Sequence, residues 1–315
     1  MDTPALPSQF TERLTALLGP ESSAKVQQTF ATGHPTTFRV NTLKADPTKV
    51  AADLASAGFE LQPANFYPAA FILQNKSLGE LSEQPAYKNG EIYVQNFSSM
   101  LPPLILDPQP GDKVADLAAA PGSKTTQLAA LMQNDGLILA NDASTIRLYK
   151  LKANLEQQGA TCVHTSRGLA ELMWRKHSSQ FDHCLVDVPC SMEGRIRLDR
   201  PKTFEKWSLK SIKQLAKRQR QMLRSAVSMT KPGGTIVYST CTLAPEENEA
   251  VVDWALQKSE GAVVVEQIQL SGVPFSAGIT EWEGVQFDQQ VARTSRVLPD
   301  GVFEGFYVAL LRRIL

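Results

Sequence analysis

Hydrophobic and polar residues follow one regular pattern from about residue 102 to the end of the chain. Short apolar runs alternate there with segments whose apolar residues recur at helical spacing. The pattern predicts strands at 114–118, 137–142, 160–166, 181–187, 235–239, 263–268 and 305–311, and helices at 122–134, 144–157, 169–176, 208–229 and 246–258. Repeated strand–helix–strand units with right-handed crossovers form a mostly parallel sheet with helices on both faces. We therefore predict an α/β domain over residues 96–315.

The first 95 residues are less regular and predict a small α+β domain over residues 1–95. Apolar residues at helical spacing indicate a helix within 8–30, broken near Gly19-Pro20, and a second helix at 47–58; short strands are expected at 37–44, 59–62, 70–74 and 91–95. Arg39, Asn41 and Lys44 lie on or beside the first of these strands. They suggest a sheet that faces a polynucleotide, and a solvated strand face is the alternative.

Two predicted strands carry reactive side chains where they end. The strand at 235–239 follows the turn residues Pro232-Gly-Gly and leads directly to Cys241, and the strand at 181–187 ends in Asp187, with Cys190 three residues later. Open α/β sheets place their chemistry at the carboxyl ends of strands, and neighbouring strands lie about 5 Å apart. If these two strands are neighbours, two thiols and a carboxylate share one pocket.

The loop after the first strand of this domain has the composition of a ligand-binding turn. Its small residues and Gly122 let the backbone approach a ligand, and the following helix N-terminus offers free N–H groups. Alone, such a loop is more often a plain connection. Asp142 ends the next strand, where a carboxylate can bind both ribose hydroxyls of an adenosine. The chain has neither Gly-x-Gly-x-x-Gly nor the Walker sequence, which disfavours dinucleotides and nucleoside triphosphates.

The charge balance sets limits on nucleic-acid binding. Lys+Arg 32 against Asp+Glu 32 gives no net charge, so any basic surface must be local. A basic stretch follows Cys190 and continues along the long predicted helix: Arg195, Arg197, Arg200, Lys202, Lys206, Lys210, Lys213, Lys217, Arg218, Arg220 and Arg224. Such a stretch could neutralise RNA phosphates. The alternative is a solvated helix face whose apolar residues pack inward.

The cysteine spacing and the lack of a long apolar run predict a cytoplasmic protein without a metal. The four cysteines form no Cys-x-x-Cys pair, so we expect neither structural zinc nor disulfides, and Cys162 and Cys184 are expected to be buried within strands. No signal-peptide pattern is present, and no apolar run reaches about 18 residues. We expect no membrane partner and a monomer.

Five ordered segments resemble the NOL1/NOP2/Sun (RsmB/NOP) family of RNA (cytosine-5)-methyltransferases, over nearly the whole chain. They are Phe38–Lys44, Ile92–Met100, Asp116–Thr126, Asp187–Ser191 with Gly194, and Tyr238–Leu243 followed by Pro245–Glu249. The resemblance implies a Rossmann-like class I methyltransferase with a seven-stranded sheet, and an N-terminal RNA-binding unit. It also implies S-adenosylmethionine as cofactor and rRNA or tRNA as substrate.

The resemblance also implies roles for individual residues. Cys241 is the nucleophile that adds to C6 of cytosine and so activates C5. Asp187 contacts the N3/N4 edge, which favours a protonated carboxyl, and Cys190 helps to release the product. The cofactor-binding residues would be Ala118, Ala119, Ala120, Pro121, Gly122, Ser123, Lys124, Asp142, Arg147, Ser166 and Asp187. Lys124 could instead only cap its loop.

One segment departs from the family. An Asp usually follows the third strand near the adenine, whereas this chain reads Val163-His-Thr-Ser-Arg-Gly168. We expect Ser166 to take that place with a weaker contact, since a hydroxyl binds the adenine amine less firmly than a carboxylate. This departure motivates an alternative function, a catalytically weak RNA-binding assembly factor. An amine-directed base methyltransferase is disfavoured, because those enzymes have an aromatic residue where this chain has Cys190.

Overall fold

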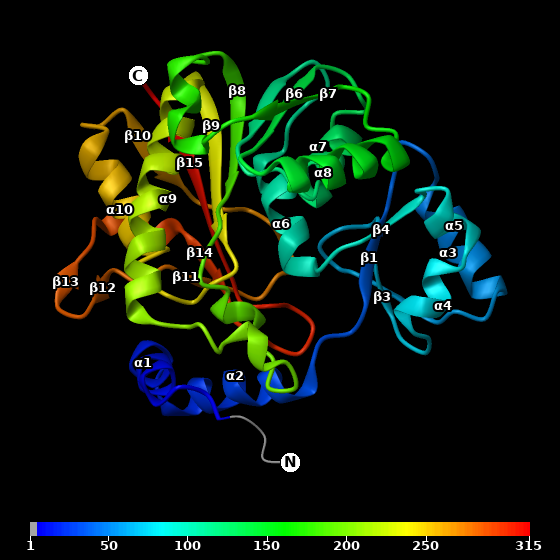
Figure 1. Cartoon of the computed structure of the whole chain (residues 1–315), viewed down its shortest axis with the longest axis horizontal. Coiled ribbons are helices and arrows are strands. Elements are labelled where there is room, and N and C mark those ends of the chain that lie inside the picture. The colour runs from blue at the N-terminus through cyan, green and yellow to red at the C-terminus, as the bar shows by residue number, and fades with distance from the viewer. Residues whose placement is uncertain (1–4) are drawn as a thin grey trace.

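The computed structural model describes residues 5–315 and is dominated by one large sheet with helices on both faces (Figure 1). The strands of this sheet are β5 (Lys113–Asp116), β6 (Leu137–Asp142), β7 (Val163–Arg167), β8 (Phe181–Asp187), β9 (Thr230–Thr240), β10 (Val263–Glu266), β11 (Phe275–Ala277), β14 (Ser295–Val297) and β15 (Phe306–Arg313). Within the described residues the order is β11-β14-β15-β9-β8-β5-β6-β7, and β10 pairs with β15. The strands β5 to β9 are parallel, and β15 runs antiparallel to β9.

The sheet confirms the predicted α/β class and adds two strands to the predicted seven. β11 and β14 were missed because strands of three residues are too short to show a period of two. β9 is also longer than predicted. Phe181 pairs with Thr230 and His183 with Thr235, so the intervening residues 231–234 bulge out of the ladder. Gly234 is required there, because a Cβ atom would lie 2.4 Å from the Asp182 carbonyl oxygen.

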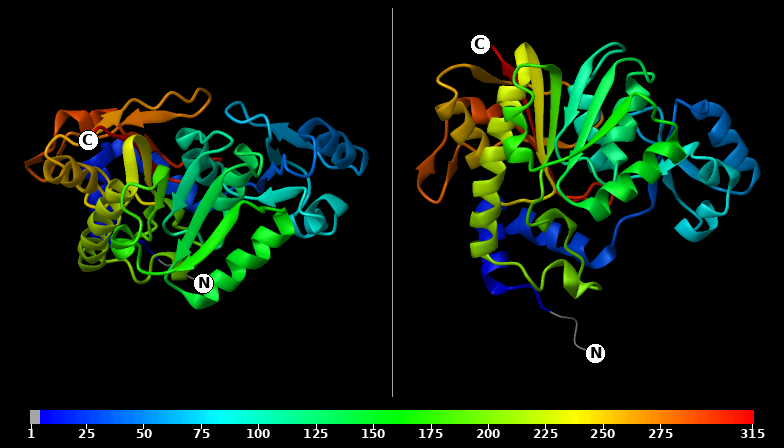
Figure 2. Two further views of the ribbon diagram at one scale, coloured as in Figure 1. Left: turned by 90° about the horizontal axis from the view of Figure 1, so that it is seen from above. Right: turned by 45° about the horizontal axis from the view of Figure 1, so that its top comes forward.

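Alternating side chains of the central strands face two separate helical layers. Leu185 of β8 and Val237 of β9 belong to the hydrophobic cluster that includes α6 (Phe97–Leu106), α7 (Ser123–Leu131) and α8 (Thr145–Gln158). Val186 and Ile236, one residue away, belong to the cluster with α9 (Leu209–Met229) and α10 (Glu249–Lys258). Figure 2 shows α9 and α10 side by side, away from the small N-terminal sheet.

In this domain one helix was missed and two predicted helices need correction. Segment 97–106, where two prolines had masked the pattern, is the helix α6. Segment 169–176 contains only a 3₁₀ helix, Ala170–Arg175. The helix expected from residue 246 begins at Glu249, because residues 244–248 form turns. Further short elements are β12 (Glu281–Trp282), β13 (Val285–Gln286), and 3₁₀ turns at Glu193–Arg195, Pro201–Thr203 and Gln289–Arg293.

The N-terminal region divides into two parts that pack in different places (Figure 1). One is a four-stranded antiparallel sheet of β2 (Leu61–Pro63), β3 (Ala70–Leu73), β1 (Thr37–Val40) and β4 (Ile92–Val94), with α3 (Pro47–Ser56), α4 (Leu78–Ser82) and α5 (Pro85–Lys88). The other is α1 (Ser8–Leu18) and α2 (Pro20–Thr32), whose Phe10 and Phe30 pack with Ile196 and Phe204. The boundary after residue 95 stays a prediction, and residues 1–4 lie outside the described residues.

Two residues expected to face a polynucleotide instead join the small sheet to the large domain. Arg39 is fully buried and donates to Thr126 Oγ1 of α7 at 2.8 Å, and burial lowers its pKa to about 10. Asn41 is also buried and donates to the Gln158 carbonyl oxygen of α8 at 2.8 Å. The prediction was wrong for both, since their charge and polarity are used in contacts between elements. Lys44 is exposed but donates to the Gln157 carbonyl oxygen at 2.6 Å.

Candidate active site

The ends of β8 and β9 bring two thiols and a carboxylate together. The strands are parallel neighbours with Asp187 opposite Ser239, and the Ser239 hydroxyl donates to Asp187 Oδ1 at 2.8 Å. Cys190 and Cys241 follow these two residues on adjacent loops, and their Sγ atoms lie 3.3 Å apart. The juxtaposition follows from the strand register, because both loops leave the sheet at the same edge.

A cavity of about 460 Å³ opens beside the thiols. Its lining residues are Ser99, Asp116, Ala118, Ala119, Ala120, Pro121, Ser123, Lys124, Arg147, Asp187, Val188, Pro189, Cys190, Met192, Arg195, Cys241 and Phe306. The loop after β5 therefore forms one wall and the two cysteine loops the other. Of the predicted site residues, Gly122, Asp142 and Ser166 do not line this cavity. Ser99, Asp116, Met192, Arg195 and Phe306 line it and had not been predicted as site residues.

The two thiols differ in their acid strength. The hydrogen bond from the Cys190 thiol lowers the pKa of Cys241; burial opposes this shift and the Arg195 guanidinium adds to it. The same hydrogen bond and burial raise the pKa of Cys190 well above its ordinary value. Because a pair of thiols this close shares its protons, the two opposite pKa shifts make Cys241 the stronger acid of the pair. The thiolate is the reactive form of cysteine, so Cys241 is the better candidate nucleophile of the two.

Lys124 connects the loop after β5 with the carboxylate of β8. Its ammonium lies 2.7 Å from Asp187 Oδ2 and donates to Ser99 Oγ at 2.8 Å. Lys124 therefore does more than cap its own loop. In this ion pair Asp187 is the acceptor and Lys124 the proton donor, so the arrangement does not require the protonated carboxyl that the resemblance implies.

The cofactor side of the cavity is held by fewer contacts. Gly122 has a φ of 111°, and a Cβ there would lie 2.9 Å from Leu151 Cδ1. Asp142 is buried; its Oδ1 accepts from the Ser144 amide at 2.9 Å, whereas Oδ2 has no hydrogen bond within the described residues and lies 3.4 Å from Arg147 Nη1. Arg147 also donates to the Ala120 carbonyl oxygen. Arg147 therefore bridges the loop and the Asp142 carboxylate.

Ser166 lies at the end of β7, opposite Asn141 of β6 and half-buried. Asn141 directly precedes Asp142, so Ser166 and Asp142 lie at the same edge of the sheet. Asp116 lies on the other side, at the end of β5. Burial raises the pKa of Asp116 to about 6, although its hydrogen bond from Thr125 opposes the shift.

Two buried glutamates clamp the cysteine loops together, and neither was predicted. Glu247 accepts from the Ser191 amide at 3.1 Å and from Gln219 Nε2 at 2.7 Å. Glu193 accepts from Thr242 Oγ1 at 3.1 Å, so each loop contributes an acid that binds the other loop. Burial raises the pKa of Glu247 to about 7, with the two hydrogen bonds acting against it. From its residue pattern, the Pro-Glu-Glu-Asn-Glu segment at 245–249 predicted a helix start, and not a contact with the loop of Cys190.

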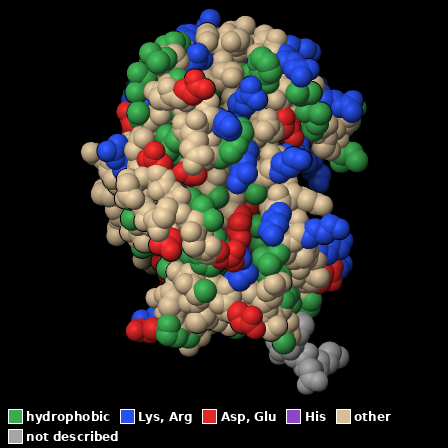
Figure 3. All heavy atoms as spheres, turned by 90° about the vertical axis from the view of Figure 1, so that its left-hand side faces the viewer, with side chains coloured by type: hydrophobic (Ala, Val, Ile, Leu, Met, Phe, Trp, Pro, Cys, Tyr) green, Lys and Arg blue, Asp and Glu red, His purple; other side chains and the backbone are tan. Residues whose placement is uncertain are grey.

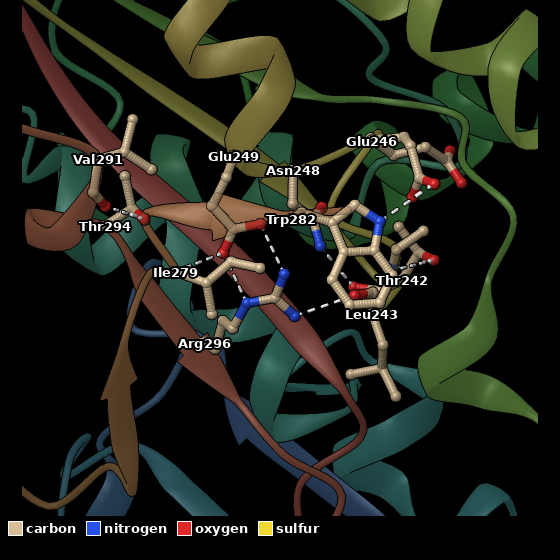
Figure 4. A network of polar contacts seen from close by, with 12 residues as sticks. Thr242, Leu243, Glu246, Asn248, Glu249, Ile279, Trp282, Val291, Thr294 and Arg296 are labelled. Carbon is tan, nitrogen blue, oxygen red and sulfur yellow. Dashed lines mark hydrogen bonds and ion pairs between the residues drawn. The ribbon is translucent and has the colours of Figure 1, made fainter. Parts of the chain in front are cut away.

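A second layer of contacts fixes the loop that follows Cys241 (Figure 4). Arg296 of β14 pairs with Glu249 through Nε···Oε1 at 2.6 Å and Nη2···Oε2 at 2.5 Å, and its Nη1 donates to the Leu243 carbonyl oxygen at 2.9 Å. The Arg296 side chain is 3% exposed and that of Glu249 0%. The unpredicted strand β14 thus supplies the cation that holds residues 243–249.

The basic helix α9 is amphipathic. Lys210, Lys213, Lys217 and Arg224 are exposed, as is expected for either a phosphate-binding or a solvated face, while Arg218 pairs with Glu171. The apolar residues of α9 lie in the core with β8 and β9. Figure 3 shows Lys and Arg side chains gathered toward one edge of its face, with Asp and Glu nearer the middle.

Residues 5–315 contain neither a metal-binding cluster nor a helix suited to span a membrane. Within this part of the chain no group of three or more His, Cys, Asp and Glu side chains is arranged to hold a metal ion. None of the helices described combines the length and the hydrophobicity that a bilayer crossing needs.

Two family models match the chain. Residues 103–312 match the 16S rRNA methyltransferase RsmB/F family, and residues 6–97 match the N-terminal domain of 16S rRNA methyltransferase RsmF. The chain is 38% identical over 283 residues to a tRNA (cytosine(49)-C(5))-methyltransferase of Pyrococcus abyssi, covering 88% of this chain and 87% of that protein. It is also 38% identical over 283 residues to the ribosomal RNA small subunit methyltransferase F of Cronobacter sakazakii, but covers only 56% of that protein.

Solved structures show the same fold. A methyltransferase homologue from Pyrococcus horikoshii superposes with a TM-score of 0.85 at 32% identity, covering 98% of this chain and 95% of the other. NSun6 from Pyrococcus horikoshii with SFG superposes with a TM-score of 0.83 at 24% identity, covering 98% of both chains. The second likeness concerns the fold alone.

Proposed function

Because the chain belongs to the RsmB/F family of methyltransferases, we propose that it methylates C5 of cytosine in rRNA or tRNA with S-adenosylmethionine as the methyl donor. The observation that carries the proposal is the 3.3 Å contact between Cys190 Sγ and Cys241 Sγ in one cavity with Asp187 and Lys124. A chemistry that needs one sulfur to attack and a second to assist explains this arrangement. Two ordinary core cysteines would not line a cavity.

Cys241 provides the nucleophile. C5 of cytosine is too weak a nucleophile to accept a methyl group directly, and addition of a thiolate at C6 makes C5 electron-rich. The hydrogen bond from Cys190 and the guanidinium of Arg195 both favour the thiolate form of Cys241. Both contacts therefore favour the form of the thiol that attacks.

Lys124 and Asp187 balance the charge that the attack places on the ring. Addition at C6 pushes electrons toward N3, which becomes basic. The ion pair at 2.7 Å can pass a proton from the Lys124 ammonium through the carboxylate to N3, while Asp187 accepts a hydrogen bond from the exocyclic amine. The Ser239 hydroxyl holds the second carboxylate oxygen at 2.8 Å, which fixes the plane of the group.

Cys190 assists release of the product. A water molecule takes the C5 proton, the electron pair of that bond re-forms the C5–C6 double bond, and the C6–S bond breaks so that Cys241 leaves as a thiolate. The proton on N3 returns through Asp187 to Lys124. Cys190 lies where its thiol can donate a hydrogen bond to the departing thiolate. A side chain without that donor would leave the adduct in place for longer.

The cavity wall formed by the loop after β5, together with Asp142 and Ser166 on the neighbouring strands β6 and β7, fits S-adenosylmethionine. Residues 118–124 offer small side chains and a helix N-terminus for the methionine part, and the Asp142 Oδ2 atom, without a hydrogen bond in the described chain, suits the ribose hydroxyls. Ser166 would contact the adenine. When bound, the cofactor supplies an electrophilic methyl group. Arg147 must release Asp142 for the carboxylate to take up the ribose.

The test identifies the methylated nucleoside. The protein is incubated with tRNA and rRNA and labelled S-adenosylmethionine, and the digested RNA is separated into nucleosides. We expect 5-methylcytidine with the wild type and with the control Cys162→Ala, and none with Cys241→Ala. A methyl group on an exocyclic amine would contradict the thiol mechanism, and no methylation despite cofactor binding would favour the assembly-factor alternative.

A further inference from the structure

A second cavity of about 400 Å³ lies beside the first and shares two of its residues, Met192 and Arg195. Its lining residues are His34, Pro35, Thr36, Thr37, Val94, Gln95, Asn96, Met192, Arg195, Arg197, Arg200, Thr203 and Glu304. They come from the segment before and along β1, the end of β4, the loop after Cys190 and the segment before β15. This volume is in the usual range for small-ligand sites, about 300–1,000 Å³. A polymer that enters one cavity can therefore continue directly into the other.

The charges around the second cavity suit a phosphate. Three arginines and one glutamate line it, and Glu304 is already occupied by Arg195 at 2.6 Å. Arg197 is fixed by Asp199, with its Nε and Nη2 atoms 2.9 and 2.8 Å from the two carboxylate oxygens. The Arg200 side chain is 68% exposed, and its Nε atom is no closer than 4.0 Å to the nearer oxygen of the same acid, so this ion pair is weak. Arg200 is thus the cation most available to a phosphate at the rim.

The interior of the second cavity suits a base. His34, Thr36 and Asn96 present polar side chains, and His34 Nδ1 has no hydrogen bond within residues 5–315. Gln95, by contrast, already donates to Ser99 and Gln127 and accepts from Arg39. A heterocycle with donors and acceptors at its edge would find partners here that an apolar ligand would not use.

Met192 stands between the two cavities in an unusual conformation. Its backbone is left-handed, with φ 59° and ψ 29°, and its side chain is 47% exposed. A non-glycine residue adopts this conformation only at a cost in free energy, and such residues cluster at functional sites. Proteins insert apolar side chains such as methionine between neighbouring bases to keep them apart.

We infer that the second cavity binds the unpaired nucleotide next to the target cytosine, with Met192 between the two bases and Arg200 at the phosphate. The inference rests on the proposed function, because it takes the first cavity as the site of the target base. It adds that the enzyme recognises at least two successive nucleotides of single-stranded RNA. Two neighbouring bases that are stacked on each other, or paired in a duplex, could not each enter its own cavity.

The experiment measures binding of short RNA to the full chain without cofactor. The probe is fluorescein-labelled AACAA RNA, compared with versions that lack the base of the central cytidine, of its 5′ neighbour or of its 3′ neighbour. Loss of one of the two neighbouring bases should weaken binding to the wild type about tenfold, as expected for a base held in a protein site. In His34→Ala this loss should disappear, because the base has no site to leave. Lys49→Gln, on the surface of α3, serves as the matched control.

Two results would overturn the inference. In the first, both probes that lack a neighbouring base bind the wild type as tightly as AACAA does. In the second, His34→Ala shows the same tenfold loss as the wild type. The probe without the central base tests the proposed function separately. If that probe alone binds as well as AACAA, the first cavity does not hold the cytosine, whatever the neighbours do. Arg200→Gln should weaken all four probes by the same factor, and no change would exclude its phosphate contact.

Discussion

The two sides of the main cavity are built in opposite ways. On the thiol side, the loops of Cys190 and Cys241 are tied by buried acids, among them Glu247 and Glu249, each with at least two hydrogen-bond partners. On the cofactor side, the buried Asp142 accepts one amide hydrogen bond and has an arginine at 3.4 Å whose side chain is 47% exposed. A covalent step needs sulfur atoms at a fixed distance, whereas a cofactor must enter and leave at every turnover.

The largest expected effect is a loss of stability on the thiol side, when the buried ion pair of Arg296 with Glu249 is broken. Arg296→Met leaves Glu249 as an unpaired buried charge, so we expect the free energy of unfolding to fall by about 3–5 kcal/mol. Urea denaturation of the full chain measures this. The control is Arg312→Met, whose ion pair with Glu266 is 42% and 32% exposed and should contribute less than about 1 kcal/mol. Equal losses in the two variants would mean that the buried pair does not hold the loop.

Glu247 gives the thiol side a pH dependence. Its pKa rises from 4.5 in the unfolded chain to about 7 in the fold, so the native state keeps a proton that the unfolded state has lost. The free energy of unfolding should therefore fall as pH rises from 4.5 to about 7, by about 3 kcal/mol from this group, and then level off. Glu247→Gln should remove most of that slope in denaturation curves measured across this range. An unchanged slope would assign it elsewhere, for instance to Asp116, whose pKa is also raised.

On the cofactor side the same kind of change should affect affinity and not stability. Asp142→Asn removes the charge that would accept the ribose hydroxyls, and we expect binding of S-adenosylmethionine to weaken about tenfold. The free energy of unfolding should change little, since this carboxylate makes few contacts. Calorimetric titration and urea denaturation of the same variant measure the two quantities. A large loss of stability with unchanged affinity would reverse the assignment.

The smallest effect should come from Ser166, where the chain departs from the family. Ser166→Asp restores a carboxylate near the adenine, and we expect binding of S-adenosylmethionine to tighten about fivefold. The comparison is with Ser56→Asp, an exposed position on α3 of the small N-terminal domain, which should not tighten binding. Weaker binding in Ser166→Asp would show that the adenine lies elsewhere.

The sequence was sufficient for those features that are local. The strand ends at Asp187 and before Cys241, and the loop around Gly122, have their own turn residues and apolar runs, so their positions could be predicted. Arg296 and Glu249 are 47 positions apart, and no local pattern pairs them. The clamp through Glu193 depends likewise on contacts between distant segments.

Burial explains the other differences between prediction and structure. Arg39 has the polarity of an RNA-binding residue, and only its position under α7 shows that its charge is used inside the protein. The helix α6 was missed because Pro102 and Pro103 disguise its pattern. A pattern shows which residue types a segment contains, and packing decides whether a polar residue faces a ligand or another element.

The central claim is that Cys241 attacks and Cys190 releases, and trapping of the covalent intermediate tests it most directly. The RNA identified by nucleoside analysis is incubated with S-adenosylmethionine and each variant, and the products are separated on a denaturing gel. Cys190→Ala should accumulate a protein–RNA adduct that survives denaturation, and Cys241→Ala should form none. An adduct that persists in Cys241→Ala and is absent in Cys190→Ala would reverse the roles of the two thiols and contradict the account.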